Sequence, residues 1–457
     1  MHFDEASWIR LERRAGETLR GSLERELRGA ILDGSLRAGA RLPSSRVLAR
    51  TIGVSRGVTS DAYGQLEAQG FLSIAPRSSP VVASVERVVR DLAQRTPEST
   101  PRFDLIPTTP DVTLFPRRLF ASALAEAART ATTAELDYGD PAGLAGLRLA
   151  LADHLGLTRG VVTSPDQILI TQGTAQAIDL VLRVLRERGL ERVTVEDPSF
   201  DSQQRRVRGH GLEVLGQPVD AGGLIVDGLQ GDAVIVTPAH QFPTGTVLRG
   251  DRRRALVEWA RTGGRYLIED DYDAEFRYDR VAVRALQGLD PDRVIYLGTT
   301  SKTLAPGLRI GWIAAPPALV DELRVTKNLL DAGSPALPQL ALARLLRTGE
   351  YARHVRRVRT IYRRRRDVLI EQLRTIPGIG IEGVAAGVHL LVRLPPGVDD
   401  VGVVEAAAAR GLGVEPVSPH CIGSVSHSGL VLGYGRLHES AIPAAVRELA
   451  DAIHSQR

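Results

Sequence analysis

Five short apolar runs, separated by stretches of helical periodicity, dominate the chain from about residue 103 onward. Each run has the length of one strand and is apolar on both faces, and the runs cover 168–170, 193–195, 233–236, 266–268 and 294–297. Strands without a polar face that alternate with helices are typical of a largely parallel sheet covered on both sides. In such sheets ligands bind beyond the carboxyl ends of the strands. The residues that follow each run are therefore the first candidates for a functional site.

Length and composition narrow the choice of protein class. A chain of 457 residues is expected to contain more than one domain. It has no run of about 18 apolar residues, and its first residues lack the apolar segment of a secretory signal, so we expect a cytoplasmic protein with no membrane partner. The single Cys421 excludes a disulfide framework and a cysteine-based zinc site, and no metal site is predicted.

Lysine is almost absent, which singles out the lysine that follows the fifth run. Of the 58 basic residues only Lys302 and Lys327 are lysines. An ε-amine can form a Schiff base with an aldehyde, which a guanidinium cannot do. Lys302 is preceded by the hydroxyls of Thr299 and Ser301 and is followed seven residues later by Arg309, and these three groups are suited to hold a phosphate.

The other four runs also end in polar or aromatic residues. Gly173 and Thr174 open a helix after the first run, where free backbone N–H groups can cradle a phosphate. The second run is followed by Phe200, the third by His240, and the fourth by Asp270 and Tyr272. Taken singly these signals are weak, because a loop phenylalanine or a strand-end carboxylate is more often structural.

The first 83 residues have a different organisation. Apolar periodicity predicts helices over 17–33, 45–51 and 56–69, and two β-like runs follow at 71–74 and 80–83. Three helices and a hairpin, with a short turn between the second and third helices, form the winged helix-turn-helix pattern. Arg46 and Arg56 lie at helix starts and Arg77 at the hairpin tip, which favours contact with DNA phosphates over a merely solvated basic face.

Two segments of this region resemble a known family. The run Gly-Ala-Arg-Leu-Pro-Ser-Ser-Arg at 39–46, and 54–56 with 62–72, resemble the GntR-type winged-helix domain, here 12–83. In that family the arginine after Leu-Pro-x-x and the Ser-Arg pair that opens the recognition helix contact DNA. The resemblance departs at Val58, where threonine is common, and at a wing tip that lacks glycine. The full set of predicted DNA contacts is Arg41, Ser44, Arg46, Ser55, Arg56, Thr59 and Arg77.

The strand-end residues, met in order, match the groups of pyridoxal 5'-phosphate. Residues 104–457 resemble a fold-type-I aminotransferase domain, an α/β fold with a large subdomain at about 138–331 and a small α+β subdomain at about 332–457. The polar segment 84–103 is expected to be an interdomain linker. The resemblance implies that Lys302 forms the Schiff base and that Asp270 pairs with the pyridine nitrogen.

The remaining site residues also follow from this resemblance. Tyr272 and His240 are expected near the ring oxygen, and Phe200 is expected to stack on the ring. The phosphate is assigned to Gly173, Thr174, Thr299, Ser301 and Arg309. Tyr138 matches a tyrosine that reaches the phosphate of the neighbouring subunit, which implies a homodimer.

The two halves in this order resemble the MocR/GabR-type regulators, above all at 240–245 and 268–276. The resemblance implies a transcription regulator that binds an operator with two half-sites and senses pyridoxal phosphate itself or an amine or amino acid. An active aminotransferase with an accessory DNA-binding domain is the alternative, and a cofactor-free dimerisation domain is a third. Val431 stands near the place of the arginine that holds the substrate carboxylate in aminotransferases, which favours sensing, with at most a residual transaminase half-reaction.

Overall fold

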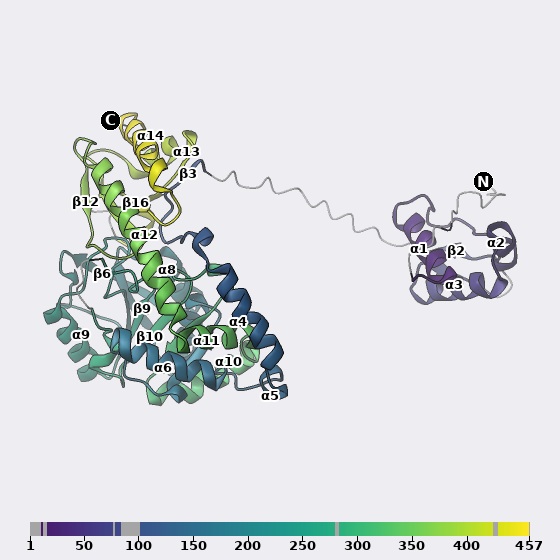
Figure 1. Ribbon diagram of the computed structural model, residues 1–457, viewed down its shortest axis with the longest axis horizontal. Helices are drawn as coiled ribbons and strands as arrows, with labels where there is room; N and C mark the ends of the chain where they lie inside the picture. Colours follow the sequence, from purple (N-terminus) through teal and green to yellow (C-terminus); the bar gives the residue numbers. More distant parts are fainter. Residues whose placement is uncertain are drawn as a thin grey trace. The chain divides into compact units, whose positions relative to one another are not determined.

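The structure is a computed structural model that describes residues 11, 16–75, 78–83, 101–278, 283–423 and 428–456. The chain divides into two compact units, Met1–Ser99 and Thr100–Arg457 (Figure 1). Arg77 and most of the expected linker lie outside the described residues. Within the described part, no helix is both long and apolar enough to cross a membrane.

The first unit is a winged helix, as predicted. Its elements are α1 (Leu19–Leu32), α2 (Ser45–Ile52), α3 (Arg56–Ala68) and the hairpin of β1 (Leu72–Ser73) with β2 (Val81–Val82). Side-chain oxygens of Thr18, Ser44 and Ser55 accept hydrogen bonds from backbone N–H groups in the first turn of each helix. Gly53, at a φ of 71°, ends α2 and makes the tight turn into α3. Leucines of all three helices pack into one core with Leu72 and Val82.

The second unit is built on an eight-stranded sheet. The strand order is β4 (Ile168–Thr171), β11 (Gly311–Ala314), β10 (Val294–Thr299), β9 (Tyr266–Asp271), β8 (Ala233–Val236), β5 (Arg192–Asp197), β6 (Glu213–Asp220) and β7 (Gly223–Leu224). Strands β10, β9, β8, β5 and β6 run parallel, whereas β11 is antiparallel to both its neighbours and β7 to β6. The predicted parallel sheet is therefore mixed at its edges.

Helices cover both faces of this sheet because alternate strand residues are apolar on each side. One face packs against α7 (Thr174–Glu187), α8 (Asp201–Gly209) and α10 (Val320–Asp331). The other packs against α4 (Arg117–Thr130), α6 (Ala145–Arg159), α9 (Gly250–Gly263), α11 (Ala336–Arg347) and the start of α12 (Glu350–Leu373). A short α5 (Thr133–Leu136) lies between α4 and α6 in the chain.

A smaller antiparallel sheet completes the unit, with the order β12 (Gly380–Glu382), β13 (His389–Arg393), β16 (Gly429–Gly433) and β15 (Glu415–Pro416). Its core includes α13 (Asp400–Ala409), α14 (Ile442–His454) and the second half of α12, a long helix whose start packs with the large sheet (Figure 1). Strand β3 (Phe103–Asp104) joins this part by pairing with β14 (Leu412–Gly413).

Two predicted boundaries differ from the structure. Phe103, expected as the last linker residue, is buried in the small core, so the linker ends earlier. The small subdomain was expected from residue 332, yet α11 packs entirely with the large sheet, and only within α12 does the chain pass to the small core. Apolar helices do not show in their own sequence which of two cores they join.

Candidate cofactor site and nucleic-acid interface

The five predicted segments lie together where the strands of the large sheet end. Because β4, β10, β9, β8 and β5 share one direction, their carboxyl ends lie together. Asp270 on β9 stands opposite Leu297 on β10 in the register of the two strands. The segment with Lys302 and that with Asp270 therefore leave the sheet side by side.

The predicted phosphate residues come together at the start of α7. Gly173 precedes this helix at a φ of 83°, and no side chain caps the free N–H groups there. A Cβ on Gly173 would lie 3.1 Å from the Arg309 guanidinium, which donates to the carbonyl of Gln172. The hydroxyls of Thr299 and Ser301 are hydrogen-bonded at 2.8 Å. Backbone donors, hydroxyls and one guanidinium are a fitting set for a phosphate dianion.

Asp270 is buried and only half satisfied. Its Oδ2 accepts a hydrogen bond of 2.7 Å from the amide of Gln203, while its Oδ1 has no partner among the described residues. Burial, with the neighbouring charge of Asp271, raises the pKa of Asp270 to about 7. An unpaired, buried carboxylate oxygen at this place fits the protonated nitrogen of a pyridine ring.

Lys302 is half-buried, and its amine donates to the carbonyl of Thr108. Burial lowers the pKa of Lys302, and the charges of Asp273 and Asp270 oppose that shift. A lowered pKa increases the fraction of neutral amine that can attack a carbonyl carbon. The backbone of Thr108, whose carbonyl accepts this hydrogen bond, has a left-handed conformation. Its φ of 58° is uncommon outside glycine.

Aromatic rings close the site. Phe200 stacks on Phe242 with ring centres 3.8 Å apart and meets Tyr272 edge-on at 5.3 Å. The Tyr272 hydroxyl donates to the carbonyl of His240 at 3.0 Å, and burial raises the Tyr272 pKa well above its ordinary value, so the phenol stays protonated. One face of the Phe200 ring is therefore covered by Phe242, which was not among the predicted site residues.

The predicted His240 has two buried neighbours that were not predicted, Asp273 and His389. His240 Nδ1 lies 2.9 Å from Asp273 Oδ2, and the His240 ring centre is 4.6 Å from that of His389. His240 Nε2 and both His389 ring nitrogens are buried without a partner in the described chain. Burial and the neighbouring His240 lower the pKa of His389 well below its ordinary value. The sequence signal that could have identified Asp273 is the family resemblance of the segment 268–276, in which it lies.

Two predicted features lie apart from this cluster. Tyr138 is 90% exposed and does not join the residues at the strand ends of its own chain. Val431, near the place of the expected carboxylate-binding arginine, is buried with Leu391 and Val417, and Arg436 pairs with Asp104 at 2.7 Å. The described residues at the strand ends therefore include no arginine at that place.

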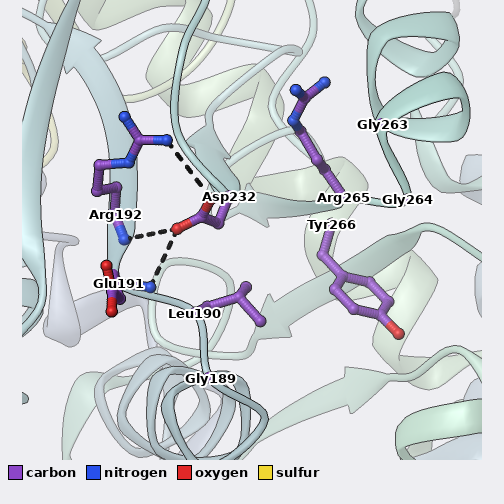
Figure 2. A pocket seen from close by; sticks show the side chains of 9 residues that line it. All are labelled: Gly189, Leu190, Glu191, Arg192, Asp232, Gly263, Gly264, Arg265 and Tyr266. Carbon is purple, nitrogen blue, oxygen red and sulfur yellow. Dashed lines mark hydrogen bonds and ion pairs between the residues drawn. The ribbon is translucent and has the colours of Figure 1, made fainter.

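A hollow of about 480 Å³ at the other ends of these strands is lined by none of the predicted residues (Figure 2). It lies at the amino ends of β5, β8 and β9. The Asp232 carboxylate there accepts hydrogen bonds from the backbone N–H groups of Glu191 and Arg192 at 3.0 and 2.9 Å. These hydrogen bonds connect neighbouring loops, so the role of Asp232 is structural.

In the winged helix, most of the predicted DNA contacts are on the surface. Arg41, Arg46 and Arg56 are exposed, and none has an ion-pair partner in the described part of the chain. The exposed hydroxyls of Ser44 and Ser55 accept the capping hydrogen bonds and keep their own protons to donate.

The prediction for Thr59 is wrong. Its side chain is fully buried, and its hydroxyl donates to the carbonyls of Ser45, at 2.8 Å, and Arg56. Thr59 therefore fastens α3 to α2 and does not reach the surface that would face DNA. A helical position that is polar by residue type can still point inward, which the helical period alone did not reveal.

Comparison with known proteins agrees with both halves of the fold. Residues 19–82 match the family model "Bacterial regulatory proteins, gntR family", and residues 113–419 match "Aminotransferase class I and II". The chain is 28% identical to the multiple substrate aminotransferase of Thermococcus profundus, whose crystal structure superposes with a TM-score of 0.73 over 81% of this chain and 95% of that one.

Two relatives share the whole arrangement. The chain is 33% identical to the pyridoxine biosynthesis transcriptional regulator PdxR of Corynebacterium glutamicum, over 94% of this chain and 95% of the relative. It is 30% identical to the probable rhizopine catabolism regulatory protein MocR of Rhizobium meliloti, over 97% and 95%. The chain therefore belongs to the MocR-type transcriptional regulators, DNA-binding proteins that join a GntR winged helix to an aminotransferase-like domain.

Proposed function

We propose that this regulator binds pyridoxal 5'-phosphate at Lys302 and changes its hold on operator DNA in response to that cofactor or to an amine or amino acid. The observation that carries the proposal is the unpaired Asp270 oxygen, next to a lysine of lowered pKa and a phosphate cradle. When bound, the cofactor supplies an aldehyde that condenses with amines. The name of the Corynebacterium relative, a regulator of pyridoxine biosynthesis, supports the cofactor itself as the signal.

The bond between Lys302 and Thr108 offers a path for the signal. Thr108 belongs to the first segment of the second unit, a few residues after the stretch that joins the units in sequence. Asp111 anchors the far end of this segment to α12 through Arg365 at 2.9 Å, and the Asp111 N–H donates to Tyr362. A lysine has three donors as an ammonium and at most one as a Schiff base, so cofactor binding weakens the hold on Thr108.

We also propose a homodimer. Apolar side chains are exposed around Tyr138, on α5 and along α10, and they include Leu136, Val325, Leu329 and Leu330. Arg324 of α10 pairs with Asp140 at 3.0 Å, which places the Tyr138 segment beside that helix. A second copy covering this surface would let Tyr138 reach the partner's phosphate cradle. Two winged helices would then serve two half-sites.

An active aminotransferase is the second candidate, and the similarity to the multiple substrate aminotransferase favours it. One measurement tests the binding of the cofactor, which both candidates require, and a second separates the candidates. Purified protein titrated with pyridoxal phosphate should develop a visible absorbance band that Lys302→Ala lacks. Steady transamination of common amino acids would instead establish an enzyme, and a wild-type protein without the band would refute the cofactor proposal.

A further inference from the structure

Two histidines and one carboxylate come together in the second unit from three segments that are distant in sequence. His240 follows β8, Asp273 follows β9, and His389 is the first residue of β13 in the small sheet. One ring nitrogen of each histidine and a carboxylate oxygen of Asp273 all lie within 4.8 Å of one another. In the described part of the chain, no other three histidine, cysteine or acidic side chains form such a group. Imidazole nitrogens and carboxylate oxygens are ligands of transition metals in proteins.

The three side chains are shielded from solvent and have few partners. Each of the three residues is only 2% exposed. His240 Nε2 and both ring nitrogens of His389 have no hydrogen-bond partner within the described residues, where the ion pair of Asp273 is with His240 alone. Buried nitrogens are normally hydrogen-bonded, and a buried carboxylate normally faces a cation. A bound cation would satisfy both requirements.

The backbone leaves room for this group and holds it in place. Gly387 comes two residues before His389, and its N–H donates to the carbonyl of Phe276 at 2.7 Å. This hydrogen bond joins the segment after Asp273 to the start of β13. A Cβ on Gly387 would collide with the His240 ring and would lie 2.6 Å from Asp273 Oδ2. The ligand atoms therefore meet at a point where only glycine fits.

The donor set and its spacing suit a zinc ion. Zinc bonds to histidine and carboxylate are about 2.0–2.2 Å long, so the ligand atoms of a tetrahedral site are roughly 3.4 Å apart. Small side-chain rotations reach this spacing from the present one, in which His240 Nδ1 and Asp273 Oδ2 are 2.9 Å apart. Three protein ligands leave a fourth position, which a water molecule takes in zinc sites of this kind.

We propose that His240, Asp273 and His389 bind a divalent transition metal ion in the cofactor-free protein, with Zn²⁺ as the expected occupant. The ion connects the small sheet, through His389, to the loops after β8 and β9 of the large sheet. It therefore stabilises the second unit, since a ligand that binds only the folded state raises its stability. The inference does not depend on pyridoxal phosphate, because all three ligands belong to the chain.

The test uses the full-length protein without a histidine tag, stripped of metal by a chelator and of any cofactor. Co²⁺ is the probe, because four-coordinate Co²⁺ absorbs visible light far more strongly than the hydrated ion. We expect a visible band that saturates at a single ion per chain and that Zn²⁺ abolishes by displacing Co²⁺. His389→Gln and Asp273→Asn should each weaken binding by about a hundredfold or more, because loss of even an outer partner of a ligand costs about 10–100-fold.

His210→Ala is the matched control and should bind Co²⁺ as the wild type does. His210 lies 3.3 Å from Asp179, yet no third metal-binding side chain joins this pair in the described residues. A wild-type protein without the Co²⁺ band overturns the inference, as does a band of undiminished affinity in either variant, because the ion then binds elsewhere. If the variants fail to fold, judged by circular dichroism, the wild type decides: Zn²⁺ should raise its melting temperature, and an unchanged value overturns the inference. The cofactor band is recorded in a separate titration, so failure of the metal site leaves the proposed function standing.

Discussion

The two lysines of this chain differ in their hydrogen-bond partners, although burial lowers the pKa of both amines. Lys327 is fully buried, and its ammonium is held by Asp331 at 2.7 Å and by Ser334 at 3.2 Å. Lys302 donates to the carbonyl of Thr108. We therefore expect pyridoxal phosphate followed by borohydride to label the folded protein at Lys302 and to spare Lys327. Peptide mass spectrometry checks this, with Lys327→Arg keeping the label and Lys302→Ala losing it; a label on Lys327 would contradict the assignment.

The raised pKa of Asp270 predicts that the stability of the cofactor-free protein depends on pH. Its pKa is about 7 in the folded chain, because of burial, and about 4 in an unfolded one. Between these values the folded state keeps a proton that the unfolded state releases, so the free energy of unfolding falls as pH rises from 4 to 7. Asp270→Asn should reduce this fall by an amount on the order of a few kcal/mol.

Urea unfolding at pH 5 and pH 7 measures the effect of Asp270. Some slope will remain in the variant, because burial also raises the pKa values of Glu196 and Glu269 to about 7. Asp451→Asn, on the exposed side of α14, is the matched control and should keep the wild-type slope. If Asp270→Asn has the same slope as the wild type, the Asp270 carboxyl is not held protonated in the folded, cofactor-free protein.

Among the elements, α2 and α3 are joined by one buried hydroxyl in addition to their shared apolar core. Thr59→Val keeps the shape of the side chain but leaves the carbonyl of Ser45 without its 2.8 Å donor. We expect a loss of about 1–3 kcal/mol from the stability of the winged helix. Thr51→Val, which removes an exposed hydroxyl bond within α2, should cost little. Thermal unfolding of the two variants measures this, and equal melting temperatures would argue against the role of Thr59.

The strand β11 must pass close to the start of α7. A Cβ on Gly311 would lie 2.8 Å from the Cα of Gly173, closer than real contacts allow. Gly311→Ala should therefore push the two apart and weaken binding of pyridoxal phosphate by about tenfold or more, the cost of moving backbone donors off the phosphate. Gly307→Ala has free space around its Cβ and is the control. Absorbance titration compares the two, and equal affinities would show that the phosphate binds elsewhere.

The sequence predicted those parts of the site that follow directly from strands. Lys302, Asp270 and Gly173 each stand at the end of an apolar run, and a parallel sheet brings such ends together. His389 and Thr108 were not predicted, because folding brings them to the site from segments distant in sequence. Phe242 lies two residues after the predicted His240, and only the packing of its ring on Phe200 shows that it belongs to the site. Thr59 was assigned from its residue type, and only the packing of α2 on α3 shows that it points inward.

At the scale of the whole molecule, we propose that the state of the Lys302 amine affects the binding of the winged helix to DNA. Within the second unit the link is the segment from β3 to Asp111, which Lys302 holds at Thr108 and α12 holds at Asp111. Ligands shift such an equilibrium only by binding its two states unequally. The exposed Arg56 at the start of α3 should supply affinity for DNA without affecting cofactor binding.

The central claim is tested most directly by the dissociation constant for operator DNA, measured at one fixed salt concentration with and without pyridoxal phosphate. We predict that the cofactor changes this constant several-fold for the wild type and leaves it unchanged for Lys302→Ala. Arg56→Ala should weaken binding in both conditions while the cofactor band stays intact. A wild-type constant indifferent to the cofactor, or an equal shift in Lys302→Ala, would contradict a sensor built on Lys302.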